Sequence, residues 1–366
     1  MPRRSLIWPT TLLTMFSFRT TAISEQLDKG LTEGRVACMC TPGCWNSSTG
    51  EYLPDFFRAR GNLVKVFGPA APEFSPQAGH IDFSASDLEG LDAVVIDIQD
   101  VGSRYFPYTR DVLRLLSFRA RMEEGPSIYI IDHINPAGRV VEGTIPVLEP
   151  DLWTPKVAHR HGLTLAELCN LYCSEIGARF PLHIISAMCS EVGKDLLPWT
   201  VAPAPDFPGM FTPEMYSGGA LWTATSITPG IGTPRPYEYI GAPFVSNNAI
   251  PPSPQGVLMR PCSFTPVYGP YAGEDCHGYQ IILLPGAQYH SLLHTVQLMR
   301  WFADRDSRFE LTADLLERID DPVITEYLRG GITFDIVQEH VKLEEQKWIR
   351  KAKRFLLYDD SPYRIK

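Results

Sequence analysis

The first half of the sequence predicts an α/β fold built around a parallel sheet. Short apolar runs that suit buried strands alternate there with helical patterns, at the lengths of βαβ units. The chain has 366 residues, which is long for one ordinary hydrophobic core and favours two domains. A run rich in proline and glycine begins near Pro198, so we expect a first domain over residues 21–195 and a second over residues 196–366.

The expected elements follow the apolar periodicity of the chain. In the first domain we expect strands at residues 36–39, 62–67, 93–98, 127–131 and 182–188, and helices at residues 52–59, 109–121 and 165–175. Thr164 and Glu167 form a capping box that marks the start of the third of these helices. In the second domain we expect a strand at residues 278–284, a helix at 291–302 and a helical tail over 311–357, after a loop-rich stretch that proline dominates.

Residues 1–20 have the order of a leader, with Arg3 and Arg4 before an apolar run. Pro9 interrupts that run and Arg19 follows it closely, so an export signal and a disordered leader both stay open. We find no stretch that is long and apolar enough to span a bilayer. The 8 cysteines lack the spacing of a metal site, which favours buried thiols and a reducing compartment. Localisation and oligomeric state stay open.

The composition excludes some functions. The formal charge of −9 argues against nucleic acid as a partner. The first strand runs into Cys40-Thr41-Pro42-Gly43-Cys44, without the glycine pattern of a dinucleotide site. A parallel sheet is therefore no evidence for NAD here. The sequence implies no metal and no organic cofactor.

Residues 91–108, LDAVVIDIQDVGSRYFPY, place polar groups where the central strand ends. Asp97 and Asp100 stand where a buried strand runs into a loop and a helix, at the carboxyl edge of the expected sheet. Open α/β sheets bind their ligands at this edge. An arginine and three aromatic rings follow the acids, which suits a polar, ring-shaped ligand. The alternative is that the two aspartates only cap the following helix or bind loop amides.

Six stretches form a recognisable set, namely VVIDIQDVGSRYFPY at 94–108, IIDHINPAGRVVEG at 130–143, RHGLTLAEL at 160–168, GIGTPRPYEYIGAPF at 230–244, CHGYQIIL at 276–283 and FLLYDD at 355–360. Together they resemble the NamZ-type exo-β-N-acetylmuramidases, a family of peptidoglycan glycosidases formerly catalogued as a domain of unknown function. The resemblance implies a Rossmann-like α/β domain joined to a second, smaller α/β domain, with the site in the cleft between them. It also implies release of terminal N-acetylmuramic acid from the non-reducing end of peptidoglycan fragments.

The sequence departs from the family pattern where chemistry is expected. The family typically has Phe-Gly-Pro-Glu-His-Gly after the second strand, and its glutamate is the expected catalytic acid. This chain has Phe67-Gly68-Pro69-Ala70-Ala71-Pro72, and the next acid is Glu73. The family's Asp-Arg-Pro-Asn-Pro becomes residues 132–136, DHINP, and its Ser-Glu-Gly-Arg-Gly-Thr becomes residues 228–233, TPGIGT.

Three functions therefore stay open. The first is an active glycosidase, which needs two carboxyl groups roughly 5 Å apart for retention or roughly 6.5–9.5 Å apart for inversion. The second is a saccharide-binding homologue that has lost catalysis, since loss of an acid/base group commonly lowers the rate about 10²–10⁴-fold. The third is a scaffold whose partner is another protein. The retained acids, arginine and aromatic rings argue against the third.

Nine residues are candidates for the site. The candidate catalytic residues are Glu142, Glu73, Asp100 and His161. The candidate substrate-binding residues are Arg104, Tyr105, Tyr108, Asn135 and Arg235. Arg104 is the first choice and Arg235 the second for the lactyl carboxylate of muramic acid, because a guanidinium can bind a carboxylate through two hydrogen bonds. The tyrosines suit stacking on the sugar or bonds to its hydroxyls, and Asn135 suits the acetamide.

Overall fold

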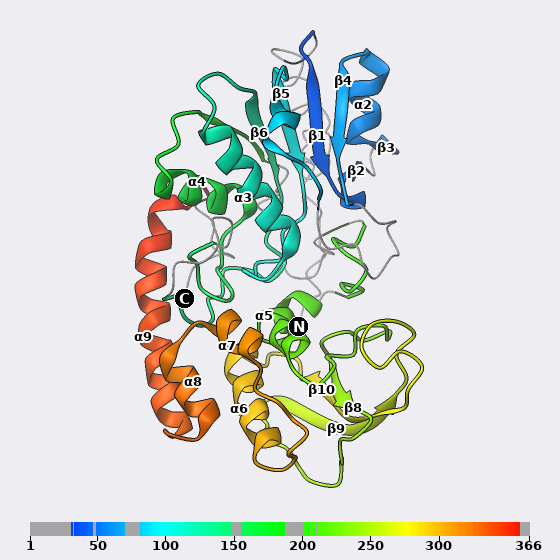
Figure 1. The fold of residues 1–366 in the computed structure, drawn as a ribbon, viewed down its shortest axis with the longest axis vertical. Coiled ribbons are helices and arrows are strands. Elements are labelled where there is room, and N and C mark those ends of the chain that lie inside the picture. Colours follow the sequence, from blue (N-terminus) through cyan, green and yellow to red (C-terminus); the bar gives the residue numbers. More distant parts are fainter. Residues whose placement is uncertain are drawn as a thin grey trace, which may run out of the picture.

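The computed structural model describes residues 31, 33–46, 49–69, 81–147, 155–186, 199, 201–209 and 211–358. Two regions are visible in Figure 1, with a parallel sheet and its helices above, and a small sheet with further helices below. The helix α9 (Phe334–Ala352) runs along one side of both regions. The predicted leader lies outside the described residues, as does Glu73.

The upper region is an α/β domain on a five-stranded sheet with the strand order β4-β1-β5-β6-β7. Its strands are β1 (Val36–Cys40), β4 (Leu63–Phe67), β5 (Ala93–Asp97), β6 (Ser127–Asp132) and β7 (Leu182–Ser186). Every neighbouring pair is parallel. Each residue of β1 and β5 is buried, as expected for central strands that helices cover on both faces. The predicted α/β class is confirmed.

Helices cover the two faces of this sheet. Residues of α3 (Pro107–Ala120) and α4 (Leu165–Glu175) pack with Ile96 and Ile130 in one apolar cluster. Residues of α2 (Leu53–Arg60) pack with Val95 in another. The predicted capping box is confirmed, because the Thr164 side chain accepts a hydrogen bond from the Glu167 amide. Proline at the start of α3 carries no amide hydrogen to satisfy, so the helix begins earlier than predicted.

The strand order has one reversal that matters for function. From β1 the chain crosses first to β4 on one side and then to β5 on the other. The ends of β1 and β5 therefore flank a topological switch point, where open α/β sheets leave a crevice for ligands. This carboxyl edge faces the lower region of the molecule (Figure 1).

The lower region contains an antiparallel sheet with the order β8-β10-β9. Its strands are β8 (Tyr239–Ala242), β9 (Val257–Phe264) and β10 (Cys276–Leu283). The helices are α5 (Thr212–Gly219), α6 (Ser291–Ala303), α7 (Ala313–Ile319), α8 (Pro322–Arg329) and α9. We did not predict β9, which lies in the proline-rich stretch and contains Pro261. It is an edge strand, where a proline without an amide hydrogen is tolerated.

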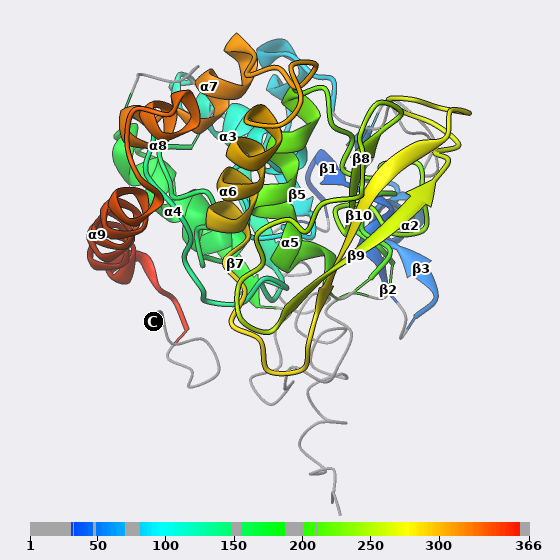
Figure 2. The same cartoon turned by 90° about the horizontal axis from the view of Figure 1, so that it is seen from below.

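Several short elements complete the described fold. The strands β2 (Trp45–Asn46) and β3 (Glu51–Tyr52) pair as a small ribbon beside α2, and the 3₁₀ turns are η1 (Pro42–Cys44), η2 (Ala85–Leu88), η3 (Ala220–Ala224) and η4 (Lys353–Phe355). Figure 2, seen from below, shows α5 and α6 side by side. The predicted boundary near residue 196 stays a prediction, because residues 187–198 lie outside the described part.

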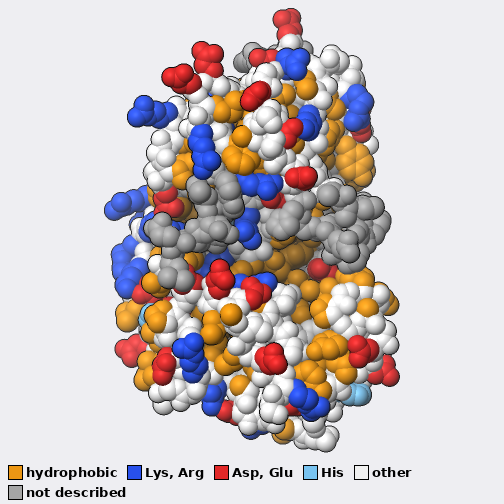
Figure 3. Space-filling view, viewed as in Figure 1, with side chains coloured by type: hydrophobic (Ala, Val, Ile, Leu, Met, Phe, Trp, Pro, Cys, Tyr) orange, Lys and Arg blue, Asp and Glu red, His pale blue; other side chains and the backbone are white. Residues whose placement is uncertain are grey.

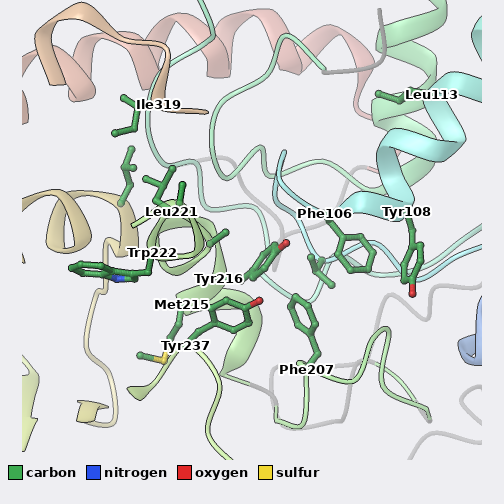
Figure 4. Close-up of a cluster of buried hydrophobic side chains, with 14 of the residues drawn as sticks. Phe106, Tyr108, Leu113, Phe207, Met215, Tyr216, Leu221, Trp222, Tyr237 and Ile319 are labelled. Carbon is green, nitrogen blue, oxygen red and sulfur yellow. The ribbon is translucent and has the colours of Figure 1, made fainter. Parts of the chain in front are cut away.

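One apolar core continues from the upper region into the lower one. Phe106 of the loop after β5 packs against Phe207, with ring centroids 5.7 Å apart. Phe207 packs against Tyr216 at 4.8 Å, and Tyr216 against Tyr237 at 5.0 Å. Figure 4 shows these rings as a continuous row. Aromatic side chains of the proline-rich stretch thus form the core that joins the two regions, since large aromatic rings usually pack in protein cores.

The described residues were also compared with the requirements of a membrane-spanning helix and of a metal site. None of the helices among them has the length and apolar character needed to cross a membrane. Within the same residues, no group of three or more histidine, cysteine or acidic side chains is arranged to hold a metal ion. The described cysteines are unpaired and, except for the half-buried Cys262, buried.

Candidate functional site

Three of the sequence motifs meet at the carboxyl edge of the sheet. The amide of Arg104 donates to the carbonyl of His159 at 3.1 Å, and the amide of His161 donates to the carbonyl of Gly102 at 3.0 Å. Glu142 and Arg160 exchange two backbone hydrogen bonds, each of 3.0 Å. The motifs that we singled out in the sequence are therefore neighbours in space. Together they form a tightly bonded layer between the sheet and the lower region.

Gly102 shows how closely this layer is packed. Its φ of +79° is a left-handed conformation, and an added Cβ would lie 2.4 Å from Oδ1 of Asn135. Asn135 is itself buried, and it donates to the Leu163 carbonyl at 2.9 Å and accepts from the Ala137 amide at 2.9 Å. Its amide thus holds loops together. We predicted a contact between Asn135 and an acetamide, and this burial favours a structural role instead.

Glu142 lies where the two regions join. Its carboxylate pairs with the Arg160 guanidinium at 2.8 Å and accepts from the Ser291 hydroxyl at 2.6 Å and the Leu292 amide at 3.1 Å, at the start of α6. Burial alone would raise the pKa of Glu142, but the charges of His290 and Arg160 and the bond from Ser291 outweigh it and lower the pKa. An ionised, fully buried carboxylate is a poor proton donor, so the geometry favours a structural role.

Arg104 also joins the two regions. Its guanidinium is buried and donates to the carbonyls of Thr144 at 3.0 Å, Arg318 at 2.6 Å and Ile319 at 3.0 Å. The last two carbonyls end α7, where the helix dipole favours a cation. Tyr105 donates to the same Arg318 carbonyl at 3.2 Å. The geometry therefore favours a structural role for Arg104 over the carboxylate contact that we predicted.

Asp100 and His161 are buried as well. Asp100 accepts from the Thr109 hydroxyl at 2.5 Å and from the Gly102 amide at 2.7 Å, as in the capping alternative. His161 accepts from the Leu163 amide at 3.1 Å, and burial lowers its pKa. Its Nε2 lies 3.5 Å from Asp100 and makes no hydrogen bond. The two side chains are close together, but both are fully enclosed.

The remaining candidates lie apart from one another. Tyr108 is buried beside Phe106 in the core, and burial, with the nearby Asp111 carboxylate, raises its pKa to about 12. The Arg235 side chain is 54% exposed and pairs with Glu238 at 3.0 Å. The structure does not bring either side chain to the layer formed by the motifs. Roles in catalysis or sugar binding stay predictions for all nine candidates.

Sequence reasoning missed a pair of side chains at the same edge. Asp97 is the last residue of β5, and His133 directly follows β6. Nε2 of His133 lies 2.5 Å from Oδ1 of Asp97. The signal was present, since two adjacent parallel strands both ended on acids and the second acid was followed by a histidine. What the sequence did not show was that β5 and β6 are paired, which brings the two ends together.

A carboxyl group on the opposite side of the junction was missed too. Asp206 lies in the segment that leads to α5. Five residues before it, the carbonyl of Val201 lies close to Gly43 in the turn after β1. The Tyr268 hydroxyl donates to Asp206 at 2.9 Å, and burial raises the pKa of Asp206. Figure 3 shows the surface hollowed between the upper and lower regions, with acidic side chains along the lower rim. A carboxyl group with a raised pKa near this junction suits proton donation.

Among the described residues, the buried polar atoms without a hydrogen bond near the carboxyl edge include two that lie outside the layer formed by the motifs. The Thr41 hydroxyl, directly after β1, is buried and makes no hydrogen bond. Arg110 lies in the first turn of α3, and its Nε is likewise buried without a partner. Buried polar groups are nearly always hydrogen-bonded. Both atoms therefore keep unused hydrogen-bonding capacity within the described part of the chain.

The comparisons with known proteins cover most of the chain. Residues 79–209 match the family model described as the N-terminal part of the exo-beta-N-acetylmuramidase NamZ, and residues 214–358 match the model of its C-terminal part. A peptidoglycan beta-N-acetylmuramidase NamZ from Bacillus subtilis (strain 168) is 26% identical over 288 residues, which are 74% of this chain and 68% of that protein.

Two solved structures are similar in fold. Both are DUF1343 family proteins from Bacteroides fragilis NCTC 9343. One superimposes with a TM-score of 0.75 at 18% identity, covering 93% of this chain and 98% of that chain. The other has a TM-score of 0.72 at 20% identity, covering 92% of this chain and 98% of that chain.

Proposed function

Because this chain belongs to the NamZ family of exo-β-N-acetylmuramidases, we propose that it is a glycosidase that releases terminal N-acetylmuramic acid from peptidoglycan fragments. One observation carries the proposal: both family models match, in order, the regions on either side of the junction. The reaction would break a glycosidic bond through an oxocarbenium-like transition state. The site that we propose is the crevice at the ends of β1 and β5.

Muramic acid carries a negatively charged lactyl carboxylate, so we expect a cation in this crevice to bind it. The Arg104 guanidinium is bound to backbone carbonyls, and Arg235 is paired with Glu238. Arg110 is the better candidate, since it is partly buried near the carboxyl edge and has an unpartnered Nε. Because no described acidic side chain pairs with Arg110, its guanidinium is available for a bidentate bond to a substrate carboxylate.

A saccharide-binding protein without catalysis is the second candidate. The observation in its favour is the sequence at Phe67-Gly68-Pro69-Ala70, which has alanine where the family typically has the catalytic glutamate. Such a protein would keep the crevice and the cation but lack the proton donor. Binding and turnover therefore have to be measured side by side.

The test uses a para-nitrophenyl β-N-acetylmuramide, the corresponding β-N-acetylglucosaminide and free N-acetylmuramic acid. We expect turnover of the muramide, little turnover of the glucosaminide, and binding of the free acid that weakens at least about tenfold in Arg110→Gln, as for the loss of a charge-assisted hydrogen bond. Arg308→Gln serves as the matched control, because it removes an exposed arginine that pairs with Asp306 and is not a candidate for the site. Binding without turnover would select the second candidate. Equal turnover of both glycosides would contradict a specificity for muramic acid.

A further inference from the structure

The Asp97–His133 pair has the geometry of a proton-transfer group. The side chains of Asp97 and His133 are 6% and 11% exposed, so their contact of 2.5 Å is shielded from water. A carboxylate bound to one imidazole nitrogen holds a proton there and fixes which tautomer is present. The other nitrogen, Nδ1, is then the one that gains or loses a proton. Within the described part of the chain, Nδ1 of His133 contacts no hydrogen-bonding partner.

The backbone around His133 is firmly held. Gln99 donates to the Ile134 carbonyl at 2.9 Å and to the Asp100 carbonyl at 2.7 Å, which ties the loop after β5 to the loop after β6. Asn135 is fixed to the Leu163 carbonyl at 2.9 Å. The imidazole is thus positioned by the sheet and by its neighbouring loops. Such preorganisation is what a catalytic acid requires, because no energy is then lost in ordering it.

The charges around the pair are simple. Asp132, which precedes His133, turns away and accepts from Thr164 at 2.7 Å and Ala166 at 2.9 Å. Cys40 at the end of β1 is a buried thiol whose pKa is raised, first by its hydrogen bond with Cys44 and next by burial, so it stays neutral. Asp97 is the charged group that the described structure places in contact with His133.

Resting on the proposed glycosidase activity, we propose that His133, oriented by Asp97, is the acid and base of the reaction. The Nδ1 proton of the imidazolium moves to the glycosidic oxygen while the bond from that oxygen to the anomeric carbon breaks. The bonding electron pair leaves with the oxygen. Water then adds to the anomeric carbon and returns a proton to Nδ1, so the pair ends as it began and no other reactant is consumed.

The residue type at this position supports the assignment. An imidazole can release and take up a proton at physiological pH, whereas a guanidinium in the same place could bind Asp97 but could not release a proton.

The test compares two leaving groups. Dinitrophenolate leaves without protonation, whereas a sugar or a para-methoxyphenolate needs the acid. We expect His133→Gln to lower kcat/KM about 10²–10⁴-fold on para-methoxyphenyl β-N-acetylmuramide. On the dinitrophenyl glycoside we expect a loss in kcat/KM of less than about tenfold, because kcat/KM reports the steps up to departure of the leaving group and dinitrophenolate leaves without the acid. His133→Arg keeps a cation beside Asp97, so it controls for folding and should show the same selective loss. His277→Gln, an exposed histidine that is bonded to Ser263, is the matched control.

The outcomes separate the two proposals. If the wild-type protein hydrolyses neither glycoside, the proposed function fails and this assignment fails with it. If the wild type is active and His133→Gln lowers both rates equally or lowers neither, the assignment is overturned while the function stands. The same holds if Asp206→Asn, and not His133→Gln, shows the selective loss. The assignment is supported if both His133 variants show the selective loss, and if the pH profile is bell-shaped for the wild type but lacks one limb for the variants.

Discussion

Replacing Glu142 by glutamine would decide between its structural role and the catalytic role that the sequence predicted. Glutamine keeps the size of the side chain but removes the charge that faces the buried Arg160 guanidinium, 2.8 Å away. The two side chains are only 1% and 3% exposed, so water cannot replace the lost partner. Removing one partner of a buried ion pair typically costs about 3–5 kcal/mol. For a chain of 366 residues, this corresponds to a fall in Tm of about 4–6 °C.

The assay is thermal unfolding by circular dichroism, together with kcat on a chromogenic muramide well below Tm. We expect a lower Tm and a kcat that stays within about threefold of the wild type, because no transition-state contact is removed. Glu344→Gln is the control, since it breaks an exposed pair with Lys347 that is worth less than about 1 kcal/mol. An unchanged Tm combined with a large loss of kcat would refute this reasoning and restore Glu142 as a catalytic acid.

Three further predictions follow from the same layer and from the core. Gly102→Ala should lower the free energy of unfolding by about 3 kcal/mol in chemical denaturation. Gly61 is the control, because its φ is also positive, at +77°, but an added Cβ would meet no atom within 4 Å, so Gly61→Ala should cost only about 1 kcal/mol. Equal losses in the two variants would contradict the crowding of Gly102 against Asn135. Burial lowers the pKa of His294 to about 4, so the folded state disfavours protonation of this side chain. As the pH falls from 6.5 through 4, the protein should therefore lose up to about 3 kcal/mol of its free energy of unfolding. His294→Gln should reduce this loss when unfolding is measured at a series of pH values. Arg104→Lys should lower Tm, because an ammonium cannot reach all the carbonyls that surround the guanidinium. The same variant should bind free N-acetylmuramic acid as tightly as the wild type in a titration. A loss of affinity at unchanged Tm would instead support the predicted contact of Arg104 with the substrate carboxylate.

Much of the upper region was predictable because its signals are local. Apolar runs of strand length located β1, β5 and β6 to within about two residues, a typical boundary error. The capping box located the start of α4, since it depends on only Thr164 and Glu167. By contrast, α5 and β9 were missed, because both lie in a stretch where proline and glycine obscure the periodicity.

The candidate site was predicted in place but not in detail. The sequence located the carboxyl edge of the sheet, because strand ends and polar residues coincide there. It favoured Asp100 and Glu142, but the structure binds Asp100 to Thr109 within the upper region and binds Glu142 to Ser291 at the junction of the two regions. It did not join Asp97 to His133, which lie 36 residues apart in the chain. Contacts of this kind depend on strand pairing, which no local pattern specifies.

The sequence by itself determined the α/β class, the order of the elements in the upper region and the family to which the chain belongs. Those properties depend on periodicity, caps and motifs that act over a few residues. Only the tertiary structure decided which polar side chains are enclosed and which groups they bind. Arg104 and Arg110 illustrate the difference, since both lie near the start of α3. The Arg104 guanidinium binds carbonyls at the end of α7, whereas Nε of Arg110 is buried without a hydrogen bond to any described residue. Burial is a property of the packed chain, because it depends on residues that are distant in sequence.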